Sequence, residues 1–174
     1  MPELSRTLNR CTRTSATHPK FPAAAAKSDL EFIPLEVIFR WGVVPGSSLL
    51  KRDATLKPFA RFAEPLIEYS TKLEATDRLL AREEALTLAG SSEILSALDT
   101  YAKKLALTLR DRLKGCGLEL WDGKIECAWH RKLGKVVMVD AITPDEIRVT
   151  LPGLENIPLS KELLRQWIGG TNWA

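Results

Sequence analysis

Apolar and polar residues alternate over residues 33–41, and this period of two predicts a β-strand. One side of the strand is wholly apolar and consists of Leu35, Val37, Phe39 and Trp41. The opposite side consists of Glu36, Ile38 and Arg40. Gly42 and Pro45 break the alternation, so the strand should end there and lead into the loop Gly46-Ser47-Ser48.

A period of three and four residues predicts a long helix that begins at Ser91. Its apolar face is formed by Ile94, Leu98, Tyr101, Leu105 and Leu109. The segment Lys114-Gly115-Cys116-Gly117 should end this helix, because glycine readily adopts the left-handed conformation found at helix C-termini. A short second helix is expected at Ser160–Trp167, where the serine can cap the first turn.

Two apolar-rich runs, Lys124–Trp129 and Lys135–Ile142, flank a five-residue segment and predict a β-hairpin. We expect the register that places Lys124 opposite Asp140. One face of the hairpin is then wholly apolar and contains Ile125, Cys127, Trp129, Val137, Val139 and Ala141. The other face contains Lys124, Glu126 and Asp140. A shift by one residue would mix the two faces, so the pattern favours this register.

This order of elements predicts an α+β fold with a mixed or antiparallel sheet and flanking helices, because the regular alternation of a doubly wound sheet is missing. Residues 30–174 should form this domain. Residues 1–29 carry five basic side chains against Glu3 and Asp29 and show no sustained periodicity. We expect them to be a poorly ordered leader, with a transit peptide as the alternative.

Composition narrows the classes of protein to consider. The chain has 174 residues, enough for one domain with its own core. Its net charge of +3 is too balanced to indicate nucleic-acid binding, and no apolar run is long enough to span a bilayer. The cysteines at positions 11, 116 and 127 lack paired spacing, which argues against a zinc site. We expect a soluble, cytoplasmic protein.

The predicted hairpin carries the strongest chemical signal. Its polar face brings Glu126 and Asp140 together beside Lys124, and two carboxylates suit a hard cation such as Mg²⁺. The same face could instead be solvated and hold an ordinary cross-strand pair of Lys124 with Asp140. Both interpretations stay open on the pattern alone.

Three further features have two interpretations each. The loop Gly46-Ser47-Ser48 could hold a phosphate group, or it could be a plain turn. Arg148, which follows a turn at Thr143–Glu146, could present its guanidinium to an anion or form a local ion pair. Arg40 could bind an anion or cover the sheet while its charged end stays in water. The chain contains no P-loop, GxGxxG, HExxH or GxSxG motif.

Taken in order, five segments resemble the family of SAICAR synthetase, phosphoribosylaminoimidazole-succinocarboxamide synthetase. They are IPLEVIFRW with GSSLLKR, STKLEATD, WDGKIECAW, VMVDAITPDEIR and LSKELLRQWIGG. The resemblance runs from about Leu30 to Gly170. It implies an ATP-dependent ligase of purine biosynthesis that joins L-aspartate to carboxyaminoimidazole ribotide. It also implies Mg²⁺ as a cofactor.

The resemblance assigns roles to matching positions of this sequence. The residues implied for the ribose phosphate of the substrate are Arg40, Ser47 or Ser48, and Arg148. Glu126 and Asp140 are implied to hold Mg²⁺, with Lys124 beside them. The nucleotide side is implied to involve Phe32, Ile33, Glu36 and Lys124. The remaining residues implied to line the same cleft are Lys72, Asp77, Asp122 and Asp145, and the first two are placed with Lys124 and Asp140 in catalysis.

The chain also departs from the family pattern. Residues 1–30 do not resemble the N-terminal lobe that covers the nucleotide in that family. Thr76 stands where histidine is usual, and Ala141 stands where an acid is usual. We therefore expect weak nucleotide binding, and either self-association or a second chain over the open face. The alternatives are a non-catalytic relative that binds a phosphorylated ligand or a partner, and an RNA-binding module that uses the basic leader.

Overall fold

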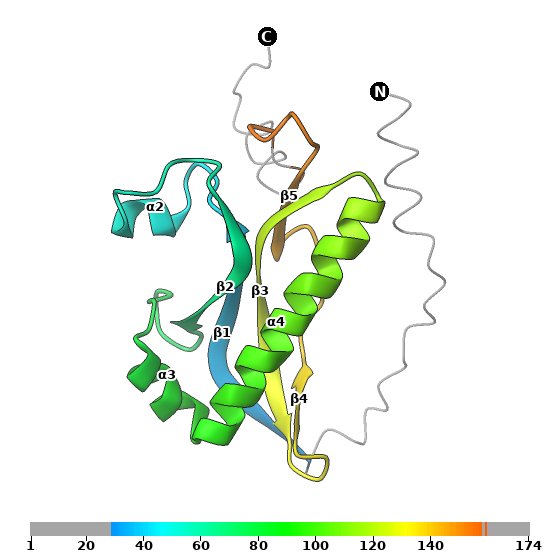
Figure 1. Cartoon of the computed structure of the whole chain (residues 1–174). Coiled ribbons are helices and arrows are strands. Elements are labelled where there is room, and N and C mark those ends of the chain that lie inside the picture. Colours follow the sequence, from blue (N-terminus) through cyan, green and yellow to red (C-terminus); the bar gives the residue numbers. More distant parts are fainter. Residues whose placement is uncertain (1–28, 158, 160–174) are drawn as a thin grey trace.

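The computed structural model describes residues 29–157 and residue 159, and the strands in this part of the chain form one five-stranded sheet (Figure 1). The strands are β1 (Leu30–Gly42), β2 (Arg61–Thr71), β3 (Glu119–His130), β4 (Lys135–Met138) and β5 (Ile147–Thr150). The helices are α2 (Ser48–Arg52), α3 (Arg82–Ala89) and α4 (Ser92–Gly115). The strand order is β2-β1-β3-β4, β5 pairs with β3, and each pairing is antiparallel. The predicted α+β class is confirmed.

Helices α3 and α4 pack on one face of the sheet, and α4 runs across it (Figure 1). The wholly apolar side of β1 supplies the centre of the core: Leu35, Val37, Phe39 and Trp41 are all buried. The indole nitrogen of Trp41 donates a hydrogen bond to the carbonyl oxygen of Ala106 at 3.2 Å. Strand β1 is therefore held against α4 by apolar burial and by a direct polar contact.

Helix α4 confirms the helix predicted from Ser91. The hydroxyl of Ser91 caps the first turn by accepting the N–H of Ile94 at 3.1 Å. Gly117, with a φ of 75°, follows the end of the helix. The most buried positions include Ala102 and Ala106, because small side chains let the helix approach the sheet closely. The larger residues of the predicted face are partly buried around them, apart from the fully buried Leu98.

The predicted register of the hairpin is wrong by one residue. Trp129 pairs with Val136 and Cys127 with Met138, and the loop between the strands has four residues rather than five. Strand β4 ends at Met138, so Asp140 lies beyond it and does not face Lys124 across a strand pair. Residues 136–139 are all apolar, so both registers offer an apolar residue at each core position and the pattern could not separate them.

The rest of the hairpin prediction fails because another strand takes the place expected for residues 139–142. The backbone N–H of Lys124 donates to the carbonyl oxygen of Glu146 at 2.9 Å, and Gly123 pairs with Ile147 of β5. The polar composition of the segment EYSTKLEATDR, residues 68–78, predicts a connection between elements, but its first four residues belong to β2. The predicted helix Ser160–Trp167 and the predicted leader, apart from Asp29, lie outside the described residues.

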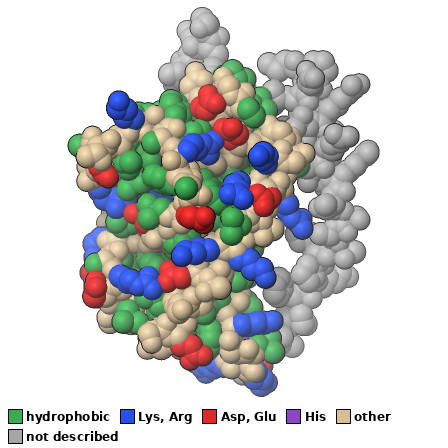
Figure 2. Space-filling view, viewed as in Figure 1, with side chains coloured by type: hydrophobic (Ala, Val, Ile, Leu, Met, Phe, Trp, Pro, Cys, Tyr) green, Lys and Arg blue, Asp and Glu red, His purple; other side chains and the backbone are tan. Residues whose placement is uncertain are grey.

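The helix-bearing face shows acidic and basic side chains interspersed among apolar ones (Figure 2). No helix in residues 29–157 is long and apolar enough to cross a membrane. The densest charge pairing lies on the other face of the sheet, which α3 and α4 leave uncovered, and this face contains the candidate site.

Candidate functional site

The register of the three central strands gathers charged residues on one face of the sheet. Residues directly opposite in an antiparallel pair point to the same face. The polar side of β1 therefore shares its face with its partners on both neighbours. The three rows across β2, β1 and β3 are Ser70-Glu36-Glu126, Glu68-Ile38-Lys124 and Leu66-Arg40-Asp122. Asp122 is also opposite Arg148 of β5, which extends the last row by a second arginine.

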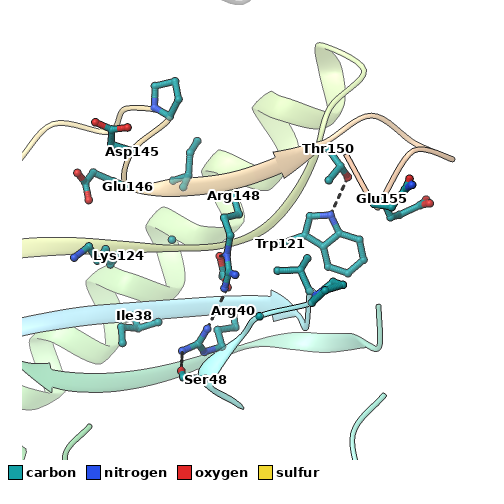
Figure 3. A pocket seen from close by; sticks show the side chains of 18 residues that line it. Ile38, Arg40, Ser48, Trp121, Lys124, Asp145, Glu146, Arg148, Thr150 and Glu155 are labelled. Atoms are coloured by element: carbon teal, nitrogen blue, oxygen red, sulfur yellow. Dashed lines mark hydrogen bonds and ion pairs between the residues drawn. The ribbon is translucent and has the colours of Figure 1, made fainter. Parts of the chain in front are cut away.

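A cavity of about 670 Å³ lies at the end of this face where β1, β3 and β5 meet (Figure 3). Its lining includes six of the residues predicted for the site: Arg40, Ser48, Asp122, Lys124, Asp145 and Arg148. These residues come from two strands, the start of a helix, and the turn and strand that follow β4. The fold therefore brings together the positions implied for the phosphorylated substrate.

Arg40 is buried, with an exposed fraction of only 4%. Its Nε donates to Glu68 at 2.7 Å and its Nη1 donates to Asp122 at 3.1 Å. The hydroxyl of Ser48 accepts from Nη2 at 3.2 Å. The interpretation of Arg40 as a solvent-facing cover of the sheet is wrong, because its charged end is enclosed by carboxylates and hydroxyls.

Arg148 and Asp122 form a bidentate pair. Arg148 donates from Nε to one carboxylate oxygen at 2.7 Å and from Nη2 to the other. The predicted turn at residues 143–146 therefore does not hold Arg148 in a purely local ion pair. The Arg148 side chain is 32% exposed, whereas Asp122 is buried. A guanidinium has five N–H donors, so donors of Arg148 remain for a ligand in the cavity.

The two serines of the predicted phosphate loop have different environments. Ser47 is 2% exposed and caps α2 by accepting the N–H of Leu49 at 3.3 Å. Ser48 is exposed and lines the cavity beside Arg40. The loop is thus a helix start, with Gly46 at a φ of 81° before it. Ser48 is the hydroxyl available to a ligand, and Ser47 has a capping role.

A second cluster, the lysine–carboxylate cluster, consists of Lys72, Lys124, Glu36 and Glu126. Lys72 lies 3.2 Å from Glu36 and 2.6 Å from Glu126, and Lys124 lies 2.8 Å from Glu36. Burial acts to raise the pKa of Glu36, but the hydrogen bonds and charges of the two lysines outweigh it, so that pKa is lowered. The same cluster ensures that Glu36 is charged at neutral pH.

The pKa values of both lysines move in the complementary direction. Hydrogen bonds to Glu126 and Glu36 raise the pKa of Lys72. Partial burial acts to lower the pKa of Lys124, but its bond to Glu36 and the nearby charge of Asp77 raise it overall. Both lysines are therefore cationic at neutral pH. Lys124 borders the cavity as well, so it connects the two clusters.

The structure does not gather all of the predicted residues. The side chain of Asp140 accepts the N–H of Ala141 at 2.7 Å, and it is not part of the cavity lining. Ile33 is buried and Phe32 is 43% exposed. These two residues lie near the other end of β1, about 25 Å from Arg40 at the usual strand rise. A nucleotide site there would be separate from the cavity.

The donor chemistry on this face fits a magnesium ion that arrives with nucleotide phosphates. Such an ion takes one or two protein carboxylates and leaves other positions to phosphate and water oxygens. Of the two predicted ligands, Glu126 lies on this face 2.6 Å from Lys72, whereas Asp140 lies beyond the end of β4. Within residues 29–157, no group of three or more His, Cys, Asp or Glu side chains is arranged so that it could hold a metal ion.

Glu68 binds Arg40 directly, but it is not among the residues predicted for the site. Glu68 begins the run EYSTKLEATDR, whose polar composition predicts a connection rather than a strand. A signal was present, since the apolar Ile67 and Tyr69 alternate with the polar Glu68 and Ser70. Reading this alternation as a strand would have placed Glu68 on the same face as Arg40.

The fold and this site together define an α+β domain whose open sheet face carries a network of paired arginines, lysines and carboxylates. The sequence model for SAICAR synthetase matches residues 11–174, and the chain belongs to the SAICAR synthetase family. A relative from Archaeoglobus fulgidus is 37% identical over an alignment of 155 positions that covers 81% of this chain and 46% of that protein. The phosphoribosylaminoimidazole-succinocarboxamide synthase of Pyrobaculum aerophilum is 29% identical over 165 residues, which are 94% of this chain and 68% of that protein.

Solved structures agree with this assignment. A SAICAR synthetase in complex with ADP is 31% identical and has a TM-score of 0.69, over 78% of this chain and 57% of that one. The SAICAR synthetase of Pyrococcus horikoshii is 29% identical with a TM-score of 0.69, over 78% of this chain and 58% of that one. The chain thus spans roughly half to two thirds of the length of the relatives it matches. The predicted family is confirmed.

Proposed function

We propose that this chain takes part in the SAICAR synthetase reaction, the ATP-dependent joining of L-aspartate to carboxyaminoimidazole ribotide. Membership of the family and the names of its relatives support this class of reaction. The observation that carries the proposal is the cavity in which Arg40, Ser48 and Arg148 converge around Asp122. This arrangement suits the ribose phosphate of the ribotide.

The cavity is suited to a phosphate because its donors are already oriented. Arg40 is fixed by carboxylates on two sides, so little side-chain entropy is lost when a ligand binds. Arg148 and the hydroxyl of Ser48 offer further donors from the two neighbouring walls. Charge-assisted hydrogen bonds of this kind are about twice as strong as neutral ones.

Lys124 is the residue best placed to act on the reacting groups. It lines the cavity, and its ammonium group also binds Glu36 of the lysine–carboxylate cluster. In the proposed reaction, ATP transfers a phosphoryl group to the ribotide carboxylate, and the amine of aspartate then displaces phosphate. A lysine held between the substrate and nucleotide sides would stabilise negative charge during that transfer. Lys72, with Asp77 in the loop that follows it, would act from the nucleotide side.

The nucleotide groups would lie over the second cluster. Phe32, Ile33 and Glu36 remain the proposed nucleotide-binding residues, and Asp145 and Asp122 the proposed substrate-side carboxylates. When bound, Mg²⁺ would neutralise phosphate charge, and Glu126 with Asp140 would hold it. The ADP complex of a SAICAR synthetase supports a nucleotide as ligand. We further propose a cytoplasmic location and an oligomer or a partner chain over the open face.

Release of ADP by the purified chain tests the proposal. The assay contains Mg·ATP, L-aspartate and carboxyaminoimidazole ribotide, and each substrate is omitted in turn. ADP release that requires all three supports the ligase. Without release, protection of the chain by the ribotide against thermal unfolding would favour a binding protein without catalysis. If the chain neither releases ADP nor is protected by the ribotide, the proposed function is refuted.

A further inference from the structure

We propose that Glu68 is a positioning residue that orients both Arg40 and helix α2 for binding of the substrate phosphate. The inference rests on the proposed function and adds a residue to its phosphate site. Glu68 does not line the cavity, so a ligand there would not touch it. Its effect would be transmitted through the arginines that it binds.

Each carboxylate oxygen of Glu68 binds a different arginine. Oε2 accepts from Nε of Arg40 at 2.7 Å, and Oε1 accepts from Nη2 of Arg52 at 2.8 Å. The Glu68 side chain is only 12% exposed, and its bond to the buried Arg40 is sheltered from water, whereas Arg52 is 37% exposed and its bond lies at the surface. Hydrogen bonds that involve ionised partners are strong in such surroundings, and they restrict the rotamers of both arginines.

The two arginines belong to two of the elements that contribute donors to the cavity. Arg40 is on β1, and Arg52 is the last residue of α2, whose first residue is Ser48. One carboxylate on β2 therefore connects the buried guanidinium to the short helix that supplies the hydroxyl. Ser48 and Arg40 also contact each other at 3.2 Å. Loss of Glu68 should loosen both donors together.

Asp122 cannot replace this function. It binds Nη1 of Arg40, whereas Glu68 binds Nε, so the two carboxylates fix the guanidinium from different directions. Asp122 is also bound by Arg148. Without Glu68, Nε of Arg40 would lose its partner, and the guanidinium would be held by Asp122 and by the longer contacts to the hydroxyls of Ser47 and Ser48, at 3.4 and 3.2 Å. Binding of a phosphate would then have to order the Arg40 side chain, and this loss of side-chain entropy would lower the affinity.

Glu68→Gln tests the inference, because glutamine keeps the shape but presents an amide N–H₂ to one of the two arginines. We expect the affinity for the ribotide to fall by about 10- to 100-fold, the range for loss of charged hydrogen bonds. The affinity for Mg·ATP should change by less than about twofold, and the ribotide KM should rise while kcat stays nearly constant. Glu68→Asp, which keeps the charge, should recover part of the affinity.

Glu119→Gln is the matched control, since Glu119 forms a similar carboxylate–arginine pair with Arg61 at 2.6 Å but lies outside the cavity. It should leave ribotide binding unchanged. Isothermal titration with the ribotide is measured on the same proteins. If the wild type binds and Glu68→Gln binds equally well, only the positioning role is refuted. Equal weakening of ribotide and ATP, or lower thermal stability without selective loss of ribotide, refutes it too. A wild type that does not bind the ribotide refutes the inference together with the proposed function.

Discussion

Replacement of Asp122 by asparagine should destabilise the protein and make its stability depend on phosphate. Asp122 is 4% exposed and accepts hydrogen bonds from Arg40 and Arg148. Asparagine keeps the shape, but it removes the negative charge and places an amide group against two guanidinium ions. The two arginines would then share a partly buried site with only Glu68 to balance the charge of Arg40.

The magnitude follows from the loss of one partner of a buried ion pair, which costs about 3–5 kcal/mol. Arg148 is partly exposed and Arg40 keeps Glu68, so we expect a value near the lower end, about 3 kcal/mol. For a chain of this size, 1 kcal/mol shifts the melting temperature by about 2–4 °C. Asp122→Asn should therefore melt about 6–12 °C below the wild type in a phosphate-free buffer.

Inorganic phosphate supplies the charge that the substitution removes. Titration with phosphate should raise the melting temperature of Asp122→Asn more than that of the wild type, because an anion that binds only the folded state stabilises it. Circular dichroism at constant ionic strength measures both effects. Glu119→Gln serves as the control and should show no added response to phosphate. An unchanged melting temperature in Asp122→Asn, or equal phosphate responses in all three proteins, would refute the account of the site.

Three other predictions address the remaining parts of the face. Arg148→Ala should weaken the ribotide by about 10-fold or more and Mg·ATP by less than about threefold in isothermal titration, because Arg148 is assigned to the ribose phosphate; equal weakening of both would contradict that assignment. Asp140→Asn should abolish Mg·ATP binding and leave the melting temperature unchanged, since its carboxylate is assigned to the metal; lower stability with intact binding would show that its role is structural. Glu36→Gln tests the lowered pKa of Glu36, whose ordinary value is 4.5. A lowered pKa adds stability above the unfolded-state pKa and loses it as the pH falls through the folded-state pKa. Urea denaturation should therefore show the advantage of the wild type over Glu36→Gln shrinking as the pH falls below about 4.5; an advantage that stays constant down to about pH 3 would contradict the ion pairs.

Local periodicity was sufficient to predict the two elements that build the core. The alternation over residues 33–41 placed four apolar side chains on one side of β1, and all four are buried. The spacing of three and four residues placed α4, and its serine cap and glycine-rich end lie where expected. These features depend on neighbouring residues in the chain, so they can be derived from the order of residues alone.

The sequence by itself also predicted the polar side of β1, the family, and six residues that the fold brings together around one cavity. Which partner each charged residue takes was decided by the tertiary structure. Arg148 binds Asp122, which is 26 residues away, and Arg40 binds Glu68, which is 28 residues away, because strand pairing sets those distances. Four consecutive apolar residues at 136–139 satisfied either hairpin register, and the pairing of β5 with β3 excluded the register that would have brought Asp140 to Lys124. Strand register depends on how the apolar faces of several strands are buried together. It therefore cannot be derived from the residues of one strand alone.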